Sequence, residues 1–223
     1  FIGQAAEGLL ETVWEPDGRS LAIFELQKLD RYRQQLVIRQ WFVEQGLKRP
    51  SRAFVDRVLN EMLVSPGNGD PVLSNQQHMI RRYRNRLFCL PASGFESETV
   101  DMTWFQGDEK VLLPGGGYLR RVRGAAGIDA RLWQTSNIDV RYRTGGEKIA
   151  LPGRQGRHSL KKLYQEAGIP PWERPSIPLV FLDGRLAAVA DLWISADFFV
   201  ENQESCFRLH WCRQKNKNGK GND

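Results

Sequence analysis

The segment LPGRQGRHSLKKLYQEAGIPPWER, Leu151 to Arg174, concentrates positive charge around one short predicted helix. Its cationic side chains are Arg154, Arg157, Lys161, Lys162 and Arg174, accompanied by His158. Two explanations fit such a segment: a solvated helix face behind a flexible basic loop, or a surface that binds an anion. Two lysines alone would favour the first explanation. With this many cations in 24 residues, and with Gly153 and Gly156 allowing close backbone approach, we favour anion binding.

A helix is predicted between Ser159 and Gly168, because apolar residues recur there with the period of one buried helix face. These residues are Leu160, Leu163, Tyr164 and Ala167. Ser159 is a typical N-cap, Gly168 is a typical stop, and Pro170-Pro171 prevents continuation. Lys161 and Lys162 then fall in the first turn, where the helix dipole disfavours cations. A phosphate bound by the free N–H groups of that turn would reverse this penalty, so we expect an anion site at the helix start.

Downstream, two apolar runs predict a β-hairpin. Ile177–Leu182 and Arg185–Ala190 flank Asp183-Gly184, a pair that suits the positive φ angles of a tight turn. Nearer the end of the chain, apolar and cationic side chains alternate as on a half-buried strand: Phe207, Arg208, Leu209, His210 and Trp211.

The first third of the sequence reads as helical. Residues Asp30 to Gln45 carry apolar side chains at helical spacing, and Gly46 is a plausible stop. Ser51 suits the N-cap of a second helix, whose apolar stripe runs from Phe54 to Leu63. The run from Met79 to Leu90 fits either a helix or a strand, and the pattern does not decide between them.

These patterns predict a multi-domain chain, in which an all-α domain precedes an α+β domain. The predicted divisions are an all-helical domain over residues 1–90, a linker over 91–100, an α+β domain over 101–212 and a disordered basic tail over 213–223.

Composition narrows the functional class. The 223 residues carry a net charge of +6, and the positive charge is concentrated at residues 141–174, 76–90 and 213–223. Charge segregated in this way suggests a polyanionic partner. Three cysteines without a C-x-x-C pair argue against a zinc site or a disulfide framework, and a reduced, cytoplasmic compartment fits best. No apolar run approaches the ~20 residues of a membrane span. The start at Phe1, without an initiator methionine, reads as the middle of a longer protein.

A second basic cluster lies in the run Met79–Leu90. Its arginines are Arg81, Arg82, Arg84 and Arg86, interleaved with the aromatic residues Tyr83 and Phe88. Such a cluster fits a nucleic-acid surface with stacking groups, but ion pairs to acids of the first domain explain it equally well. No catalytic constellation emerges: the sequence contains no nucleophile elbow, no metal-ligand set and neither S-G-G-x-D-S nor G-x-x-x-x-G-K-S/T.

The segment Arg143 to Arg174 contains several motifs that occur together in a known protein family. Four motifs closely resemble the C-terminal domain of the bacterial tRNA(Ile)-lysidine synthetase family. They are R-x-G-G-E (Arg143–Glu147), L-P-G-R (Leu151–Arg154), S-L-K-K-L-x-Q-E (Ser159–Glu166) and I-P-P-W-x-R (Ile169–Arg174). Upstream, Leu36–Ser51 and Ile80–Phe88 look like the helical middle domain of the same family. Asp191 departs from the pattern, because a small residue such as Gly is expected there.

The resemblance implies a tRNA-binding role. Enzymes of this family use ATP and Mg²⁺ to join lysine to C2 of the wobble cytidine of tRNA(Ile) with a CAU anticodon, so that it reads AUA. Their chemistry belongs to an N-terminal ATP-pyrophosphatase domain that carries S-G-G-x-D-S. Here the resemblance implies that the helical domain holds the tRNA near the active site and that the C-terminal domain engages the acceptor stem. That C-terminal domain is similar to a domain of the phenylalanyl-tRNA synthetase β subunit.

No catalytic residue can be assigned in this chain, and no membrane partner is expected; a homodimer is left open. The residues expected to contact tRNA are Arg143, Lys148, Arg154, Arg157, Lys161, Lys162 and Arg174, with Arg81, Arg82, Arg84 and Arg86 in the first domain. The alternative is a DNA-binding regulator without enzymatic activity, in which Asp30–Gln45 and Ser51–Val64 imitate a helix-turn-helix. Asp56 and Glu61 would make that second helix a poor face for phosphates.

Overall fold

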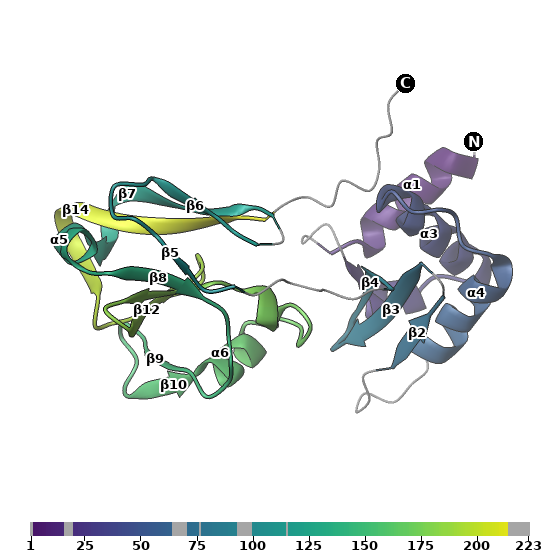
Figure 1. Ribbon diagram of the computed structural model, residues 1–223. Helices are drawn as coiled ribbons and strands as arrows, with labels where there is room; N and C mark the ends of the chain where they lie inside the picture. Colours follow the sequence, from purple (N-terminus) through teal and green to yellow (C-terminus); the bar gives the residue numbers. More distant parts are fainter. Residues whose placement is uncertain are drawn as a thin grey trace, which may run out of the picture. The chain divides into compact units, whose positions relative to one another are not determined.

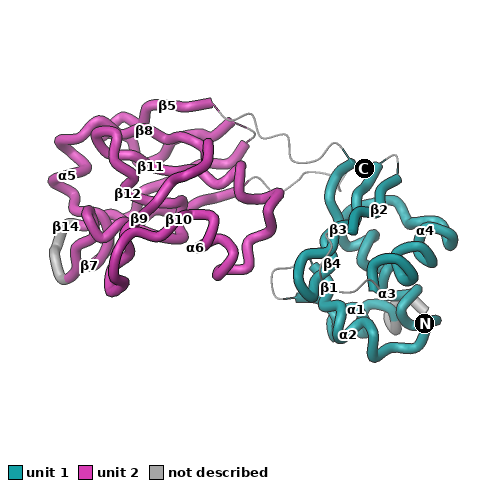
Figure 2. The backbone as a smooth tube through the Cα atoms, turned by 90° about the horizontal axis from the view of Figure 1, so that it is seen from below, with its two compact units in different colours: residues 1–94, 216–223 teal, residues 95–215 magenta. Residues whose placement is uncertain are grey.

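A computed structural model describes residues 2–15, 20–63, 71–75, 77–92, 100–114 and 116–213, with the side chains of 2–5 and 202–205 left aside. Contacts divide the chain into two compact units, residues 1–94 and residues 95–215 (Figures 1 and 2). The division falls within the predicted linker, of which residues 93–99 lie outside the described part; so does the predicted basic tail from residue 214 on. None of the described helices is long and apolar enough to cross a membrane.

Unit 1 begins with helices whose ends follow local capping chemistry. Asp30 accepts a hydrogen bond from the N–H of Arg33 (2.9 Å), and Gly46 has a φ of 71° just beyond the helix, so the predicted first helix is confirmed. Ser51 caps the second helix through the N–H of Phe54 (3.2 Å), but α-helical winding changes to π-helical winding at Val58. The helical elements are α1 (Ile2–Val13), α2 (Ile23–Gln27), α3 (Arg31–Glu44), α4 (Arg52–Arg57) and the π-helical η1 (Val58–Met62).

Unit 1 also contains an antiparallel sheet of order β1-β4-β3-β2, so the all-helical prediction is wrong. The run left open between helix and strand forms a hairpin that turns at Arg84-Asn85, where Arg84 has a φ of 54°. Ile80 and Leu87 point to the helices, so the apolar period is two rather than 3.6. The strands are β1 (Ser20–Ala22), β2 (Val72–Ser74), β3 (His78–Tyr83) and β4 (Arg86–Pro91).

Unit 2 is built around a central five-stranded sheet of order β13-β12-β11-β8-β5. A three-stranded sheet of order β14-β7-β6 packs over one face of it, and the two sheets share a core with Trp104, Trp133 and Val180 (Figure 1). The strands are β5 (Met102–Thr103), β6 (Lys110–Leu112), β7 (Tyr118–Asp129), β8 (Ile138–Arg141), β11 (Leu179–Leu182), β12 (Arg185–Val189), β13 (Trp193–Ile194) and β14 (Phe199–Cys212); helix α5 (Ala130–Thr135) follows β7.

The opposite face of the central sheet is covered by the segment that carries the basic motif. Alternation along β11 and β12 sends Leu179 and Val189 into a second core, which Leu160, Leu163 and Tyr164 complete. The covering elements are β9 (Lys148–Ala150), β10 (Arg157–Ser159), α6 (Leu160–Glu166) and the 3₁₀ turn η2 (Arg174–Ser176). The central sheet is therefore buried on both faces, which fixes the basic segment against a rigid support.

The structure confirms one predicted element of unit 2 and corrects a detail of another. The hairpin of β11 and β12 is confirmed, with φ angles of 48° at Asp183 and 75° at Gly184. Helix α6 ends at Glu166, and Ala167 is exposed as its C-cap, so its assignment to the buried face is wrong. The turn that ends the helix explains this, because the N–H of Ile169 reaches back to the carbonyl of Tyr164 (2.9 Å).

Candidate nucleic-acid interface

The basic surface of unit 2 is formed by the β9–β10 hairpin, the loop between its strands and helix α6. Arg154 lies in that loop between Gly153 and Gly156, whose φ angles are 73° and 78°. A Cβ atom added at either glycine would meet open space, so the left-handed backbone rather than crowding requires glycine there. We call Arg154, Arg157, Lys161 and Lys162 the hairpin patch.

The start of α6 does not form the expected site for a phosphate. The N–H of Leu160 donates to the carbonyl of Glu147 (2.9 Å), and the N–H of Lys162 donates to Ser159 Oγ (3.4 Å). Since these two donors are already used and the helix has only seven residues, its dipole and remaining N–H groups offer little to an anion. The cationic side chains of the hairpin patch remain as the groups that can bind one.

Acidic residues hold part of the hairpin patch in place. Glu166 accepts a hydrogen bond from Arg154 Nη1 at 2.9 Å and lies 3.9 Å from Lys162 Nζ. The hydrogen bond from Arg154 lowers the pKa of Glu166. Arg157 Nη1 lies 3.7 Å from Asp197, which also pairs with Arg185. These exposed pairs contribute little to stability, so an RNA phosphate can compete for the same guanidinium groups.

Two lysines of the predicted set differ from these arginines. Lys161 on α6 and Lys148 on β9 are exposed, and neither forms an ion pair with the residues that the structure describes. Their ammonium groups are therefore available to an anion without displacing an internal partner.

The R-x-G-G-E motif forms a closed loop before β9. The carboxylate of Glu147 accepts hydrogen bonds from the N–H groups of Thr144 (2.6 Å) and Gly145 (2.7 Å), and Arg143 Nε lies 3.3 Å away. Burial raises the pKa of Glu147, but the hydrogen bonds from Gly145 and Thr144 and the charge of Arg143 outweigh it, so the net direction is downward. Arg143 is thereby engaged within the loop, with 23% of its side chain exposed.

Arg174 occupies a structural position. Only 7% of the residue is exposed, and its guanidinium donates from Nε (3.0 Å) and Nη2 (2.8 Å) to the carbonyl of Ile169. These bonds fasten the Pro170-Pro171 segment to the following 3₁₀ turn. The expectation that Arg174 contacts RNA does not fit this burial.

The arginines of unit 1 lie on the β3–β4 hairpin, but they do not form one surface. Arg82 is on the side of the helices and donates to the carbonyl of Met62 (3.0 Å). Arg81 and Arg86 are on the opposite face of the sheet, and Arg86 pairs with Glu15 at 3.0 Å. Arg84 lies in the turn, 5.5 Å from the ring centre of Tyr83. Arg81, Arg84 and Arg86 are the members of this cluster that a nucleic acid could reach.

A groove in unit 2 adjoins the hairpin patch. Its volume is about 490 Å³, and it is lined by Arg154 from the basic loop, by Trp193 and neighbouring residues of β13, and by Phe199 and Arg208 from β14. Asp191, where the family pattern suggests a small residue, lies at this groove. The groove therefore combines arginine side chains with partly exposed aromatic and aliphatic walls, a combination that also occurs where proteins bind single-stranded nucleic acid.

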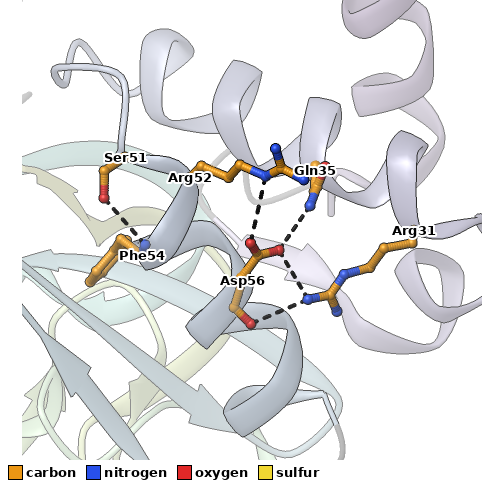
Figure 3. A network of polar contacts seen from close by, with 6 residues as sticks. All are labelled: Arg31, Gln35, Ser51, Arg52, Phe54 and Asp56. Atoms are coloured by element: carbon orange, nitrogen blue, oxygen red, sulfur yellow. Dashed lines mark hydrogen bonds and ion pairs between the residues drawn. The ribbon is translucent and has the colours of Figure 1, made fainter.

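The helix pair of unit 1 does not present a basic face for DNA. The carboxylate of Asp56 on α4 meets Gln35 Nε2 (2.8 Å) and Arg31 Nη2 (3.0 Å) from α3, and Arg52 Nε at 4.0 Å (Figure 3). The hydrogen bond from Gln35, followed by that from Arg31, lowers the pKa of Asp56. Asp56 thus docks α4 on α3 and pairs with nearby arginines, which lowers the positive charge that this helix offers to DNA phosphates.

Comparisons with known proteins agree with the division of the chain into units 1 and 2. Residues 21–88 match the family model described as "TilS substrate binding domain", and residues 138–211 match "TilS substrate C-terminal domain"; together they cover more than half of the chain. A tRNA(Ile)-lysidine synthase from Methylococcus capsulatus is 32% identical over 95% of this chain and 48% of its own length. The chain belongs to the tRNA(Ile)-lysidine synthase family.

Other members of the family give similar alignments. The tRNA(Ile)-lysidine synthase of Alkalilimnicola ehrlichii is 34% identical over 82% of this chain and 41% of its own length, and that of Coxiella burnetii is 32% identical over 92% and 45%. The chain thus spans about half the length of the curated relatives it matches. A solved structure titled "Crystal structure of TILS C-terminal domain" aligns with 52% of this chain at 24% identity and a TM-score of 0.42.

Several exposed cations of unit 2 were not in the predicted set. Lys110, Arg120 and Arg208 lie on the three-stranded sheet and face solvent, as does the imidazole of His210. The signal in the sequence was the alternation of cationic and apolar residues in the runs that form β7 and β14. This alternation alone does not predict a shared basic surface, because the strand register that places the two runs side by side is not visible in the sequence.

Proposed function

We propose that this chain is the tRNA-binding part of a lysidine-forming ligase. The ligase joins lysine to C2 of the wobble cytidine of tRNA(Ile) with a CAU anticodon, at the expense of ATP, and the tRNA then reads AUA. The hairpin patch supports the proposal most strongly, because it sets four exposed cations on a rigid support in a chain of this family. The proposed compartment is the cytoplasm, where tRNA is modified.

In this proposal the two units have different tasks. Unit 1 helps to hold the tRNA beside the active site, with Arg81, Arg84 and Arg86 as candidate contacts. Unit 2 engages the acceptor stem through the hairpin patch and Lys148, and its proposed similarity to a domain of the phenylalanyl-tRNA synthetase β subunit is consistent with that task. Such contacts position an RNA but do not read its sequence.

We propose no site for ATP or Mg²⁺ within the described residues. They contain no group of three or more His, Cys, Asp or Glu side chains placed to hold a metal ion. Gly116 and Gly117 lie in the turn between strands β6 and β7, whereas a phosphate cradle needs a strand followed by a helix. By the family resemblance, ATP, Mg²⁺ and lysine are assigned to the catalytic part of the full-length ligase, and no chemical step is assigned to a residue of this chain.

Competition between nucleic acids tests the proposal. Labelled tRNA(Ile) transcript bound to the chain at physiological salt should be displaced by unlabelled tRNA at much lower concentration than by a DNA duplex of equal length, because the proposed partner is a folded RNA, whose A-form helices differ in groove shape from B-form DNA. In parallel, the chain incubated with tRNA, ATP and radioactive lysine should incorporate no lysine. Preferential displacement by duplex DNA would instead favour the DNA-binding regulator.

A further inference from the structure

The three-stranded sheet of unit 2 has one buried and one solvent-facing side. Leu119 of β7 and Phe207 and Leu209 of β14 point toward the central sheet and are at most 6% exposed. Strand alternation sends their neighbours to the other side, which lies away from the central sheet (Figure 1). We call this side the outer sheet face; its exposed cationic or imidazole side chains are Lys110, Arg120, Arg208 and His210.

Strand register brings these groups into a row. Arg120 on β7 is paired directly with Lys110 on β6 and with His210 on β14. Neighbouring strands are ~4.8 Å apart, so three nitrogen-bearing side chains stand within ~10 Å across the sheet. Arg208 is paired with Val122, two residues along β7 from Arg120 and on the same face. The row is thus continued along the strand direction.

The stretches of β6, β7 and β14 that carry this row contain no acidic residue, whereas Asp129 and Glu201 lie farther along β7 and β14. These stretches are the paired segments 110–112, 118–123 and 206–212. Like charges placed directly opposite each other on a sheet are destabilising, and Lys110 and Arg120 form such a pair. Lys110 Nζ lies 5.4 Å from the ring centre of Tyr118, which holds the ammonium on this face but does not neutralise it. An external anion bound at this face would relieve the repulsion between Lys110 and Arg120.

The shape of the surface indicates the kind of anion. The cations are spread over three strands of a twisted sheet and do not converge on a cavity, so a small single anion would meet only one or two of them. A polyanion with regularly spaced charges can contact all of them at once. Arg208 also lines the groove that contains Arg154, so the outer sheet face is joined to the hairpin patch through that groove.

We propose that the outer sheet face is a second phosphate-binding surface, along which the RNA backbone continues from the hairpin patch through the groove to Lys110. This proposal rests on the proposed function and deepens it, because it adds contacts for the same tRNA that the sequence motifs did not indicate. Lys110 and Arg120 make the contacts with phosphate, and Tyr118 provides an aromatic surface beside them.

The test compares double variants of the chain by tRNA binding at several salt concentrations. Lys110→Ala with Arg120→Ala removes the proposed contacts. Arg154→Ala with Lys161→Ala removes the hairpin patch contacts. Arg123→Ala with Arg131→Ala is the matched control: it removes the same charge from unit 2, from the opposite face of β7 and from α5. Thermal unfolding monitors whether each variant remains folded.

The proposal predicts that Lys110→Ala/Arg120→Ala weakens tRNA binding roughly tenfold and lowers the slope of log K against log salt by about two, one for each lost phosphate contact. The control should change neither quantity beyond the general effect of its charge. A Lys110→Arg/Arg120→Lys variant should restore most of the affinity. Bound tRNA should also protect Lys110 from acetylation, as read by mass spectrometry, while Lys28 in unit 1 stays reactive.

The outcomes separate this proposal from the proposed function. If Lys110→Ala/Arg120→Ala behaves like the control while the hairpin patch variant loses binding, the outer sheet face is not an RNA surface and the proposed function stands. If the unmodified chain shows no salt-dependent affinity for tRNA, both fail. If a variant loses binding and also has a lowered melting temperature, the loss could reflect unfolding. The acetylation experiment on the unmodified chain then decides, and a Lys110 that bound tRNA does not protect overturns the proposal.

Discussion

Glu147 and Arg174 illustrate what charge counting misses at the scale of a residue. Both belong to motifs that suggested RNA binding, yet Glu147 closes the loop before β9 and Arg174 holds the carbonyl of Ile169. The backbone partners of these bonds, N–H groups for Glu147 and a carbonyl for Arg174, lie in bends whose geometry cannot be read from the sequence. By contrast, Lys161 is exposed as its position on a helix predicted, because the apolar stripe of α6 leaves it on the outer side.

Glu147→Gln should destabilise unit 2. The amide oxygen can still accept from the N–H groups of Thr144 and Gly145, but without the charge that strengthens these bonds, and the ion pair with Arg143 is lost. We therefore expect a decrease of about 1–2 kcal/mol in the free energy of unfolding. Urea unfolding at pH 7 measures this difference.

The contribution of Glu147 to the free energy of unfolding should also depend on pH, in a direction that follows from its lowered pKa. Because the folded-state pKa of Glu147 is lowered, its contribution is complete above the usual carboxyl value of 4.5 and is lost as the pH falls below it. The difference between wild type and Glu147→Gln should therefore shrink below pH 4.5. A difference that grows on acidification would contradict the assigned hydrogen bonds.

At the scale of elements, patterns with a single consistent period were sufficient and ambiguous ones were not. The cap at Ser51, the helix after Asp30 and the hairpin at Asp183-Gly184 follow from local chemistry. The secondary structure of the run Met79–Leu90 could not be predicted, because its apolar residues fit both a helical and a strand period. Packing against α3 and η1 selects the strand. The outer sheet face needed long-range register, which no local pattern contains.

Gly127→Ala tests the irregular pairing of β7 with β14. A Cβ atom at Gly127 would collide with the backbone carbonyl of Phe207, where the register between the strands shifts. The strands must separate to admit it, so unfolding should become easier by more than about 2 kcal/mol. Gly124→Ala on the same strand is the control, since its Cβ would make ordinary contacts at 3.6 Å, and it should stay within about 0.5 kcal/mol of wild type. Equal effects of the two substitutions would show that the close approach at Gly127 is absent.

Across the whole molecule, the proposed RNA binding depends on positive charge that the fold holds in place on unit 2. The central sheet is buried on both faces, so the hairpin patch on one side and the outer sheet face on the other are carried by a common rigid core. The division into two units agrees with the two family models, and the basic clusters fall one in each. The sequence predicted the class of partner from this segregation of charge, whereas the choice among individual cations required their ion pairs and burial.

The most direct test of the central claim is the salt dependence of tRNA affinity for the chain and for Arg154→Ala combined with Lys161→Ala, with Arg123→Ala/Arg131→Ala as the control. The account predicts tight binding by the unmodified chain that weakens steeply with salt. It also predicts lower affinity and a slope reduced by about two units in the hairpin patch variant, because each lost phosphate contact removes about one. Affinity and slope identical to those of the control variant would contradict it.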